Sequence, residues 1–231
     1  MAIPVDNVNM KCWIAVMNGK ASLKYHHGDL RAALIEAAAD MVQREGVGAV
    51  TMRRLSDAVG VSHAAPYRHF EDKAALLTAV AIEGFRRFGQ VLREARCDAA
   101  SKTIDRFRAM GRAYLRFVME NTAYYRLMFG QGPLRECPEL REAADAAFSE
   151  LTEAIERLQR KGLIRQDDPR AQAIFVWSIM HGFSLLVVDG KLRECSGGGE
   201  GVFASIEKLS LRALGYTGAV GRGAAVDGGL P

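Results

Sequence analysis

A glycine between two short helix-forming segments constrains the fold of this chain more than any other feature. Thr51 and Ser62 are residue types that cap helix starts, and each opens a short segment with apolar inward positions. Gly60 stands between them, and glycine accepts the positive φ that a sharp turn between helices requires. Ser56 is small enough for the point where the two helices would cross. The spacing therefore predicts a helix-turn-helix over residues 51–70.

Helical periodicity continues on both sides of this motif. Apolar residues recur at spacings of three and four from Leu30 to Met41, and Gly46 suits the end of that helix. Asp72 is a good cap for a helix that begins at Lys73. We therefore expect an all-α fold. The later helices are expected near residues 73–96, 101–120, 138–161, 168–189 and 202–214.

Changes in composition divide the chain into four parts. We expect a flexible N-terminal arm, a three-helix helix-turn-helix domain, a larger C-terminal helical bundle and a disordered, Gly-rich tail. The predicted ranges are 1–23, 24–84, 85–215 and 216–231, with the helix-turn-helix motif at 51–70.

Composition also narrows the class of protein. The net charge of +4 permits an anionic partner. Residues 86–116 contain nine Lys or Arg but only three acidic residues, and this basic excess predicts a solvated face. The four cysteines form no CxxC pair, so we expect no metal site, and reduced thiols fit a cytoplasmic protein. No GxSxG, HExxH or Walker motif occurs, so we expect no enzyme, no catalytic residue and no cofactor.

One segment favours a different class of protein. Residues 171–188 contain no Asp, Glu, Lys or Arg, and their number is close to the minimum for a membrane-spanning helix. Gln172 and His181 interrupt this segment, and a helix that is apolar all round also occurs in cores and dimer interfaces. We expect no membrane partner and keep a membrane-associated helical protein as the alternative.

Residues 51–77 read TMRRLSDAVGVSHAAPYRHFEDKAALL. With these residues, the tract from about residue 25 to 85 resembles the DNA-binding domain of the TetR family of bacterial transcriptional regulators, and YRHFEDKAALL is the most specific part of the resemblance. Further along, FVWSIMHGF resembles the Trp-x-x-x-His-Gly signature of one subgroup of the family's ligand-binding domains. The resemblance implies an all-helical homodimer that binds a palindromic operator and releases it when a small effector binds. It thus implies a repressor; an activator or an effector-independent regulator is the alternative.

On this resemblance, DNA contacts come from the starts of three helices. The Thr51 hydroxyl can reach a phosphate, although it can also serve only as a cap. His63 can bond a base edge, and Arg68 can pair with DNA or within its own domain. Lys73 stands at a helix start, where backbone N–H groups also favour an anion. The predicted DNA-contacting residues are Thr51, Arg53, Ser62, His63, Ala64, Ala65, Tyr67, Arg68, His69 and Lys73.

Pro66 lies inside the expected recognition helix. Counted from Ser62 as the cap, it occupies the fourth helical position, where its missing N–H removes one hydrogen bond. It also disfavours an α conformation at Ala65. We expect a distorted first turn that sets how Tyr67 and Arg68 face the DNA.

The resemblance also implies an effector pocket in the larger domain, lined by apolar and aromatic residues for which core packing is the alternative. Trp177 and His181 lie four residues apart on one helix face, and each has a polar group that needs a partner when buried. The helices near 168–189 and 202–214 are the expected homodimer interface. The predicted ligand contacts are Phe107, Met110, Tyr114, Phe117, Met128, Phe148, Trp177 and His181.

Overall fold

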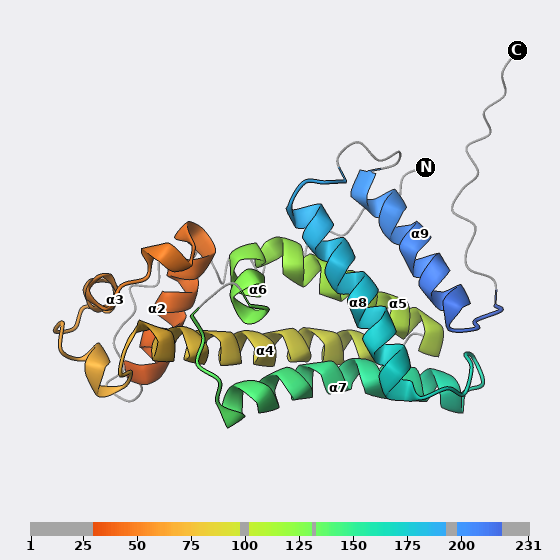
Figure 1. The fold of residues 1–231 in the computed structure, drawn as a ribbon, viewed down its shortest axis with the longest axis horizontal. Helices are drawn as coiled ribbons and strands as arrows, with labels where there is room; N and C mark the ends of the chain where they lie inside the picture. Colours follow the sequence, from red (N-terminus) through yellow and green to blue (C-terminus); the bar gives the residue numbers. More distant parts are fainter. Residues whose placement is uncertain (1–29, 98–101, 131–132, 193–197, 219–231) are drawn as a thin grey trace, which may run out of the picture.

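The computed structural model describes residues 30–97, 102–130, 133–192 and 198–218. These ranges consist of helices, turns and irregular segments and contain no strand, which confirms the all-α class (Figure 1). The expected N-terminal arm, the start of the expected DNA-binding domain and nearly all of the expected tail lie outside the described residues.

The helices follow one another with short connections. The N-terminal part holds α2 (Leu30–Glu45), the 3-10 helices η1 (Val47–Ala49) and η2 (Pro66–Arg68), α3 (Met52–Val59) and the start of α4 (Lys73–Cys97). The larger part adds α5 (Thr103–Glu120), α6 (Thr122–Met128), α7 (Pro138–Arg160), α8 (Pro169–Val188) and α9 (Gly198–Ala213). Helix α6 is absent from the sequence-based expectation, and α9 begins at Gly198 rather than near the expected residue 202. In Figure 1, α2 and α3 surround one end of α4, while α7 runs along α4 and α8 crosses near its other end.

Local capping bonds set the ends of the N-terminal helices as expected. The Thr51 hydroxyl oxygen accepts a hydrogen bond from the Arg54 amide at 3.2 Å, at the start of α3. Gly60 ends α3 in the left-handed conformation, with φ 77°. Asp72 accepts a hydrogen bond from the Ala75 amide at 2.8 Å and so caps α4. These ends fix where the exposed segment between α3 and α4 begins and stops.

Helix α4 joins two clusters of buried apolar side chains. Its first half, including Leu76 and Leu77, belongs to the cluster of the N-terminal part, and its second half, from Phe85 onward, belongs to the cluster of the larger part. Helix α6 also enters both clusters, because Tyr124 packs in the first and Tyr125 in the second. The two parts of the chain are therefore linked by shared helices.

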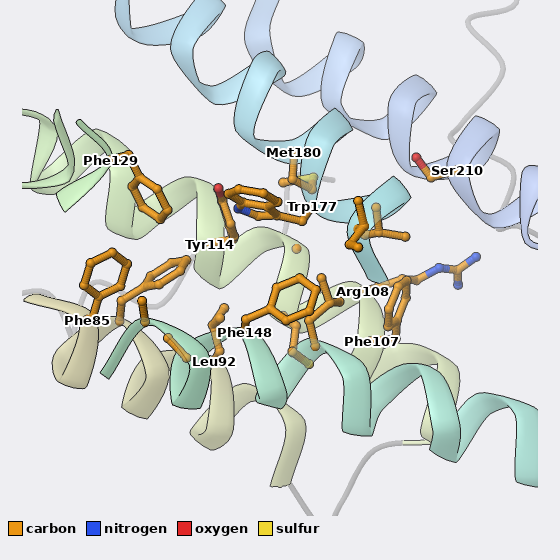
Figure 2. Close-up of a pocket in the computed structure, with 18 of the residues that line it drawn as sticks. Phe85, Leu92, Phe107, Arg108, Tyr114, Phe129, Phe148, Trp177, Met180 and Ser210 are labelled. Carbon is orange, nitrogen blue, oxygen red and sulfur yellow. The ribbon is translucent and has the colours of Figure 1, made fainter. Parts of the chain in front are cut away.

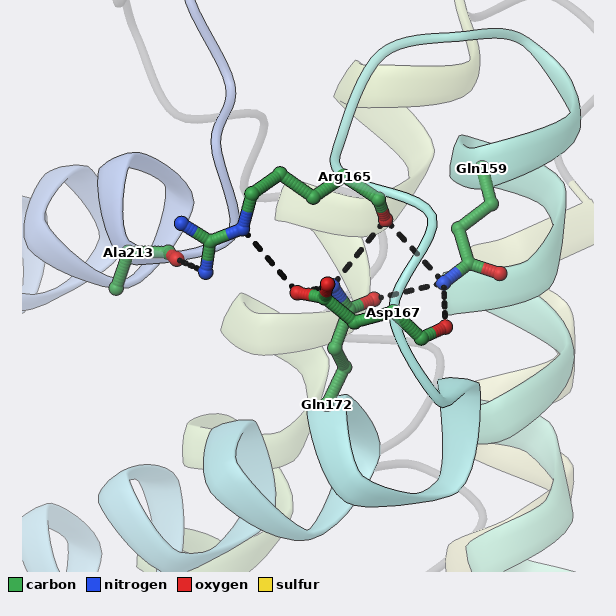
Figure 3. A network of polar contacts seen from close by, with 5 residues as sticks. All are labelled: Gln159, Arg165, Asp167, Gln172 and Ala213. Carbon is green, nitrogen blue, oxygen red and sulfur yellow. Dashed lines mark hydrogen bonds and ion pairs between the residues drawn. The ribbon is translucent and has the colours of Figure 1, made fainter.

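A polar network holds the turn between α7 and α8 (Figure 3). The buried Gln159 side-chain amide donates to the carbonyl oxygen of Asp167 at 2.8 Å and to the Gln172 side-chain oxygen at 3.0 Å. Arg165 Nη2 donates to the carbonyl oxygen of Ala213, at the end of α9, at 2.6 Å. Because the buried amides find partners, the network gives α7, α8 and α9 one defined arrangement.

The basic excess in residues 86–116 is partly neutralised by acids from distant helices. Buried Arg96 pairs with Glu150 of α7 at 2.7 Å, and Arg108 lies 2.8 Å from Glu207 of α9. The expected solvated face is therefore correct for only some of these residues.

Candidate DNA-binding surface and ligand cavity

The segment from Ser62 to Phe70 departs from the regular α-helix that the sequence predicts. The Ala65 amide donates to the carbonyl oxygen of Ser62 at 2.9 Å, which closes a turn, and Pro66–Arg68 then form η2. Pro66 lacks an N–H, so it starts a short helix rather than interrupting a longer one. Ala65 has φ −64° and ψ −44°, the α conformation that Pro66 was expected to disfavour. The expected recognition helix is corrected to a turn followed by a 3-10 helix.

Two buried side chains anchor this segment. Pro66 and Phe70 are both buried, and the Phe70 amide donates to the carbonyl oxygen of Pro66 at 2.9 Å. Between them, Tyr67 is 59% exposed, and Arg68 and His69 are exposed as well. The anchors therefore hold three exposed side chains in a fixed arrangement. Of the other predicted DNA contacts, Thr51, Arg53, Ser62, His63 and Ala64 are exposed, and Ala65 and Lys73 are half-buried.

The basic side chains of this surface differ in what they already bind. Arg54 donates to the Glu45 carboxylate at 2.8 Å and to the carbonyl oxygen of Ala49 at 3.0 Å, so it braces α3 against α2 and η1. Within the part of the chain that the structure describes, Arg53 and Arg68 form no ion pair. These two guanidinium groups are therefore available to an external anion. The internal ion pair, which was the alternative to a DNA contact for Arg68, is not formed with any described residue.

His63 has a partner that the sequence did not indicate. Its Nε2 lies 3.0 Å from Asp57 Oδ1, between two exposed side chains. A base edge would therefore have to compete with Asp57 for Nε2 or bond to Nδ1 of the same ring. Lys73 is the first residue of α4 and lies beside the backbone N–H groups of its first turn.

A cavity of about 490 Å³ lies in the larger part of the molecule. Its wall is built by α4, α5, α7, α8 and α9 together with Phe129, which follows α6. Figure 2 shows Phe85 and Phe129 at one end, Arg108 and Phe107 at the other, and Tyr114 and Trp177 between them. An apolar cavity of this size with few polar groups is typical of a small-molecule site. Of the predicted ligand contacts, those that line it are Phe107, Met110, Tyr114, Phe148 and Trp177.

Three predicted ligand contacts lie outside this lining because they pack against neighbouring helices. Phe117 packs on Phe88 of α4, with ring centroids 5.0 Å apart. Met128 faces Gly84, where a Cβ would stand 2.7 Å from the Met128 sulfur, so the glycine lets α6 approach α4. His181 is turned towards α6. Core packing, the alternative left open for these residues, describes their contacts.

Several lining residues were missed by sequence reasoning. Their helix faces show only ordinary apolar spacing, and no local pattern reveals the cavity positions of the four ionised residues, Arg108, Asp145, Arg170 and Glu207. Gly111, beside Met110 and four residues from Phe107, is a small residue among large ones and also lines the cavity. The missed lining residues that matter most are Phe85, Phe88, Arg108, Phe129, Met180 and Glu207.

A chain of hydrogen bonds leads from the cavity wall to α8. The hydroxyl oxygens of Tyr114 and Tyr125 lie 2.5 Å apart, and the Tyr125 hydroxyl lies 2.6 Å from His181 Nδ1. Burial raises the pKa of both tyrosines and lowers the pKa of His181. Tyrosine hydroxyls and a neutral imidazole are therefore the favoured states, and Tyr125 can donate to His181. These hydrogen bonds connect α5, α6 and α8 beside the cavity.

Comparisons with known proteins agree with this arrangement. The family model described as "Bacterial regulatory proteins, tetR family" matches residues 34–80, and the model described as "Tetracyclin repressor-like, C-terminal domain" matches residues 107–206. The chain belongs to the TetR family. It thus has the fold of a DNA-binding regulator, in a family whose members bind operator DNA, dimerise and bind small-molecule effectors.

Individual relatives of this TetR-family chain are more distant. The nucleoid occlusion factor SlmA of Vibrio cholerae is 28% identical over 141 residues, which cover 59% of this chain and 69% of the relative. A Rhodococcus protein of unknown function is 31% identical, has a TM-score of 0.73 and matches over 83% of this chain and 98% of its own. A TetR-family regulator from Pectobacterium atrosepticum has a TM-score of 0.61 at 23% identity, over 80% and 93% of the two chains.

The apolar helix α8 is the segment on which the membrane alternative rests. Within the described ranges it is the one helix whose length and composition would allow it to cross a membrane, and 33% of its most apolar stretch is buried. Its inner face packs in the core through Val176, Met180 and Phe183. A core helix of a soluble protein has the same composition, and DNA-binding regulators of the TetR family are soluble cytoplasmic proteins.

Proposed function

We propose that this chain is a cytoplasmic, ligand-responsive repressor, which leaves a palindromic operator when a small effector occupies the cavity. The observation that carries the proposal is the continuity of α4. Its first residue belongs to the surface around Tyr67, and its second half supplies Phe85 and Phe88 to the cavity wall. A molecule in the cavity therefore contacts the same helix that supports the DNA-binding segment, and it can favour one position of that segment over another.

The DNA-contacting residues are those of the exposed segment and its neighbours. Arg53, Arg68 and Lys73 would pair with phosphates, and Tyr67 would add a phosphate contact from its hydroxyl. His63 and Ala64 would face base edges in the major groove. In this proposal the short η2 segment takes the place of a longer recognition helix.

The homodimer interface would use the exposed apolar faces of α8 and α9. Ile174, Phe175 and Leu186 are 46%, 40% and 46% exposed on α8, and Leu209 of α9 is 62% exposed. Exposed apolar side chains grouped on neighbouring helices indicate a protein contact. A second copy covering them also accounts for the lack of charged residues in 171–188 of α8. The chain acts by binding, without catalysis.

Selection of binding sites from a random DNA library, followed by affinity measurements, tests this function. We expect a palindromic site bound more tightly as the salt concentration falls, because phosphate contacts release counterions. Lack of site-specific binding even at low salt would contradict the proposal. An increase in transcription on binding would contradict the repressor while leaving the DNA-binding function intact.

A further inference from the structure

The cavity has a polar end at which Arg108 lies. Arg108 projects from α5, and Glu207 and Ser210 line the cavity from α9. Figure 2 shows the Arg108 guanidinium and the Ser210 hydroxyl at the end away from Phe85 and Phe129. A molecule in the cavity would therefore meet Phe85 and Phe129 at one end and, at the other, polar groups that include the Arg108 cation and its neighbour Glu207.

The hydrogen-bonding capacity of Arg108 is incompletely used. Its Nε lies 2.8 Å from Glu207 Oε1, an ion-pair distance, yet the buried Nε–H is not aligned to donate a hydrogen bond. Its Nη2 is also buried and has no hydrogen-bond partner among the residues described. Nη1 lies 3.6 Å from Asp105. Both nitrogens are covered by neighbouring atoms, so a ligand would reach them only after the Arg108 side chain shifts. Because a buried charged donor without an acceptor is unfavourable, a ligand that brings an acceptor favours that shift.

Chemistry and shape together define the class of ligand. A carboxylate accepts two parallel hydrogen bonds from a guanidinium, and the pairing is stronger than that of a neutral oxygen. The rest of the wall is mainly apolar and requires an apolar body. Resting on the proposed function, we propose that the effector is an amphipathic monocarboxylate, with its carboxylate on Arg108 and its body directed towards Phe85 and Phe129.

Glu207 gives this pairing a consequence for α9. The Glu207 carboxylate lies near both Arg108 and, at 3.8 Å, Arg112 of α5. A ligand carboxylate competes with Glu207 for the same guanidinium, so it replaces an attraction between α5 and α9 with one between α5 and the ligand. Because α9 carries exposed Leu209 of the proposed interface, binding at this end acts on the contact between the two protomers.

Calorimetric titration of the full chain with matched probes tests the ligand class. Decanoate, decanol and decylammonium share an apolar body and differ in the charge of the head group; each is used below its micellar concentration. We expect decanoate to bind about tenfold or more tightly than decanol, the ratio that one charged hydrogen bond provides. Naphthoate and naphthalenemethanol repeat the comparison with an aromatic body. If neither carboxylate is preferred over its alcohol, or if decylammonium binds most tightly, the proposal is overturned.

Substitutions then test the residue. Arg108→Gln is expected to abolish the preference for carboxylates, and Glu207→Gln, which removes the competing anion, is expected to raise carboxylate affinity about threefold. Arg170→Gln is the matched control, because Arg170 also lines the cavity but its guanidinium lies over the Phe148 ring, 5.6 Å from the centroid. The control is expected to keep the preference. Should Arg108→Gln fail to fold, unchanged or weaker carboxylate affinity in Glu207→Gln overturns the proposal.

Failure of this inference differs from failure of the proposed function. Operator binding is measured without any probe, and probe binding is measured without DNA. A chain that binds its operator but shows no preference for carboxylates contradicts only the effector class. A chain that binds carboxylates through Arg108 but binds no operator contradicts only the regulator.

Discussion

The Tyr125 hydroxyl of α6 lies 2.6 Å from His181 Nδ1 of α8, while the adjacent Tyr124 hydroxyl donates to the carbonyl oxygen of Val80 in α4 at 2.9 Å. Two neighbouring residues of a short helix thus bond in opposite directions, one beside the ligand cavity and one in the cluster under the DNA-binding segment. Helix α6 is therefore a second connection between these regions, besides α4.

Tyr125→Phe is expected to lower the free energy of unfolding by about 1–3 kcal/mol, because it removes one hydrogen bond from the Tyr114 hydroxyl and leaves His181 Nδ1 without the Tyr125 hydroxyl. The measurement is equilibrium denaturation in urea. Tyr67→Phe serves as the control, since Tyr67 is 59% exposed and its change should stay within about 0.5 kcal/mol. Equal stability of Tyr125→Phe and the wild type would show that the chain of hydrogen bonds is not stabilising.

His181 is expected to make stability depend on pH. Burial lowers its pKa in the folded state below the ordinary value of 6.5, so the unfolded chain binds a proton first as the pH falls. The contribution is fully present above pH 6.5 and is lost as the pH falls from there through the lowered pKa. Denaturation at about pH 7.5 and about pH 5.5 should show a smaller difference for His181→Gln than for the wild type. An identical difference in both proteins would contradict this role.

Arg53 and Arg54 are expected to separate DNA binding from stability. Arg53→Ala should weaken operator binding and leave the melting temperature unchanged, because Arg53 has no ion pair with any described residue. Arg54→Ala should lower the melting temperature, because it breaks the contacts with Glu45 and the Ala49 carbonyl. Fluorescence anisotropy and thermal melting of both variants check the assignment, which the reverse pattern would refute.

Lys73 is expected to contribute through phosphate charge alone. Lys73→Gln should weaken binding to all operator sequences similarly and reduce the slope of log affinity against log salt by about one. Lys161→Gln is the control, because Lys161 is exposed at the far end of α7. His63→Ala, by contrast, should change the preference among sequences. If Lys73→Gln kept the wild-type slope of log affinity against log salt, the proposed phosphate contact of Lys73 would be contradicted.

Leu209→Asp is expected to dissociate the homodimer, because it places a charge in the proposed apolar interface of α8 and α9. Sedimentation velocity measures the mass of the species in solution. Met119→Asp is the control, since Met119 is 58% exposed but lies on α5. A dimer that survives Leu209→Asp and dissociates with Met119→Asp would place the interface elsewhere.

Features that depend on neighbouring residues were predictable from the sequence. The caps at Thr51 and Asp72 and the turn at Gly60 each rest on a side chain or backbone preference acting within a few residues. The long helices followed from their apolar spacing. Helix α6 was missed because it has seven residues, and Asn121 at its start makes no side-chain capping bond.

Features that depend on contacts between residues far apart in the chain could not be predicted from the sequence. Trp177 was recognisable as a cavity residue because its size and polar group stand out, whereas Phe85 and Phe129 resemble any core aromatic. The conformation around Pro66 depends on its burial against the helices beside it, which a count from a presumed cap at Ser62 ignores. The role of Arg108 depends on Glu207, ninety-nine positions further along the chain.

Helix α4 can act as a lever in the proposed response to a ligand, because its 25 residues run unbroken between the two clusters. At about 1.5 Å per residue it measures about 37 Å, so a tilt of about five degrees about its cavity end moves Lys73 by about 3 Å. That displacement is close to the spacing of successive base pairs, about 3.4 Å. In a dimer, two such helices tilting in opposite senses would change the distance between the two DNA-binding segments. The segments would then no longer fit successive grooves of the DNA, although neither segment changes its own conformation.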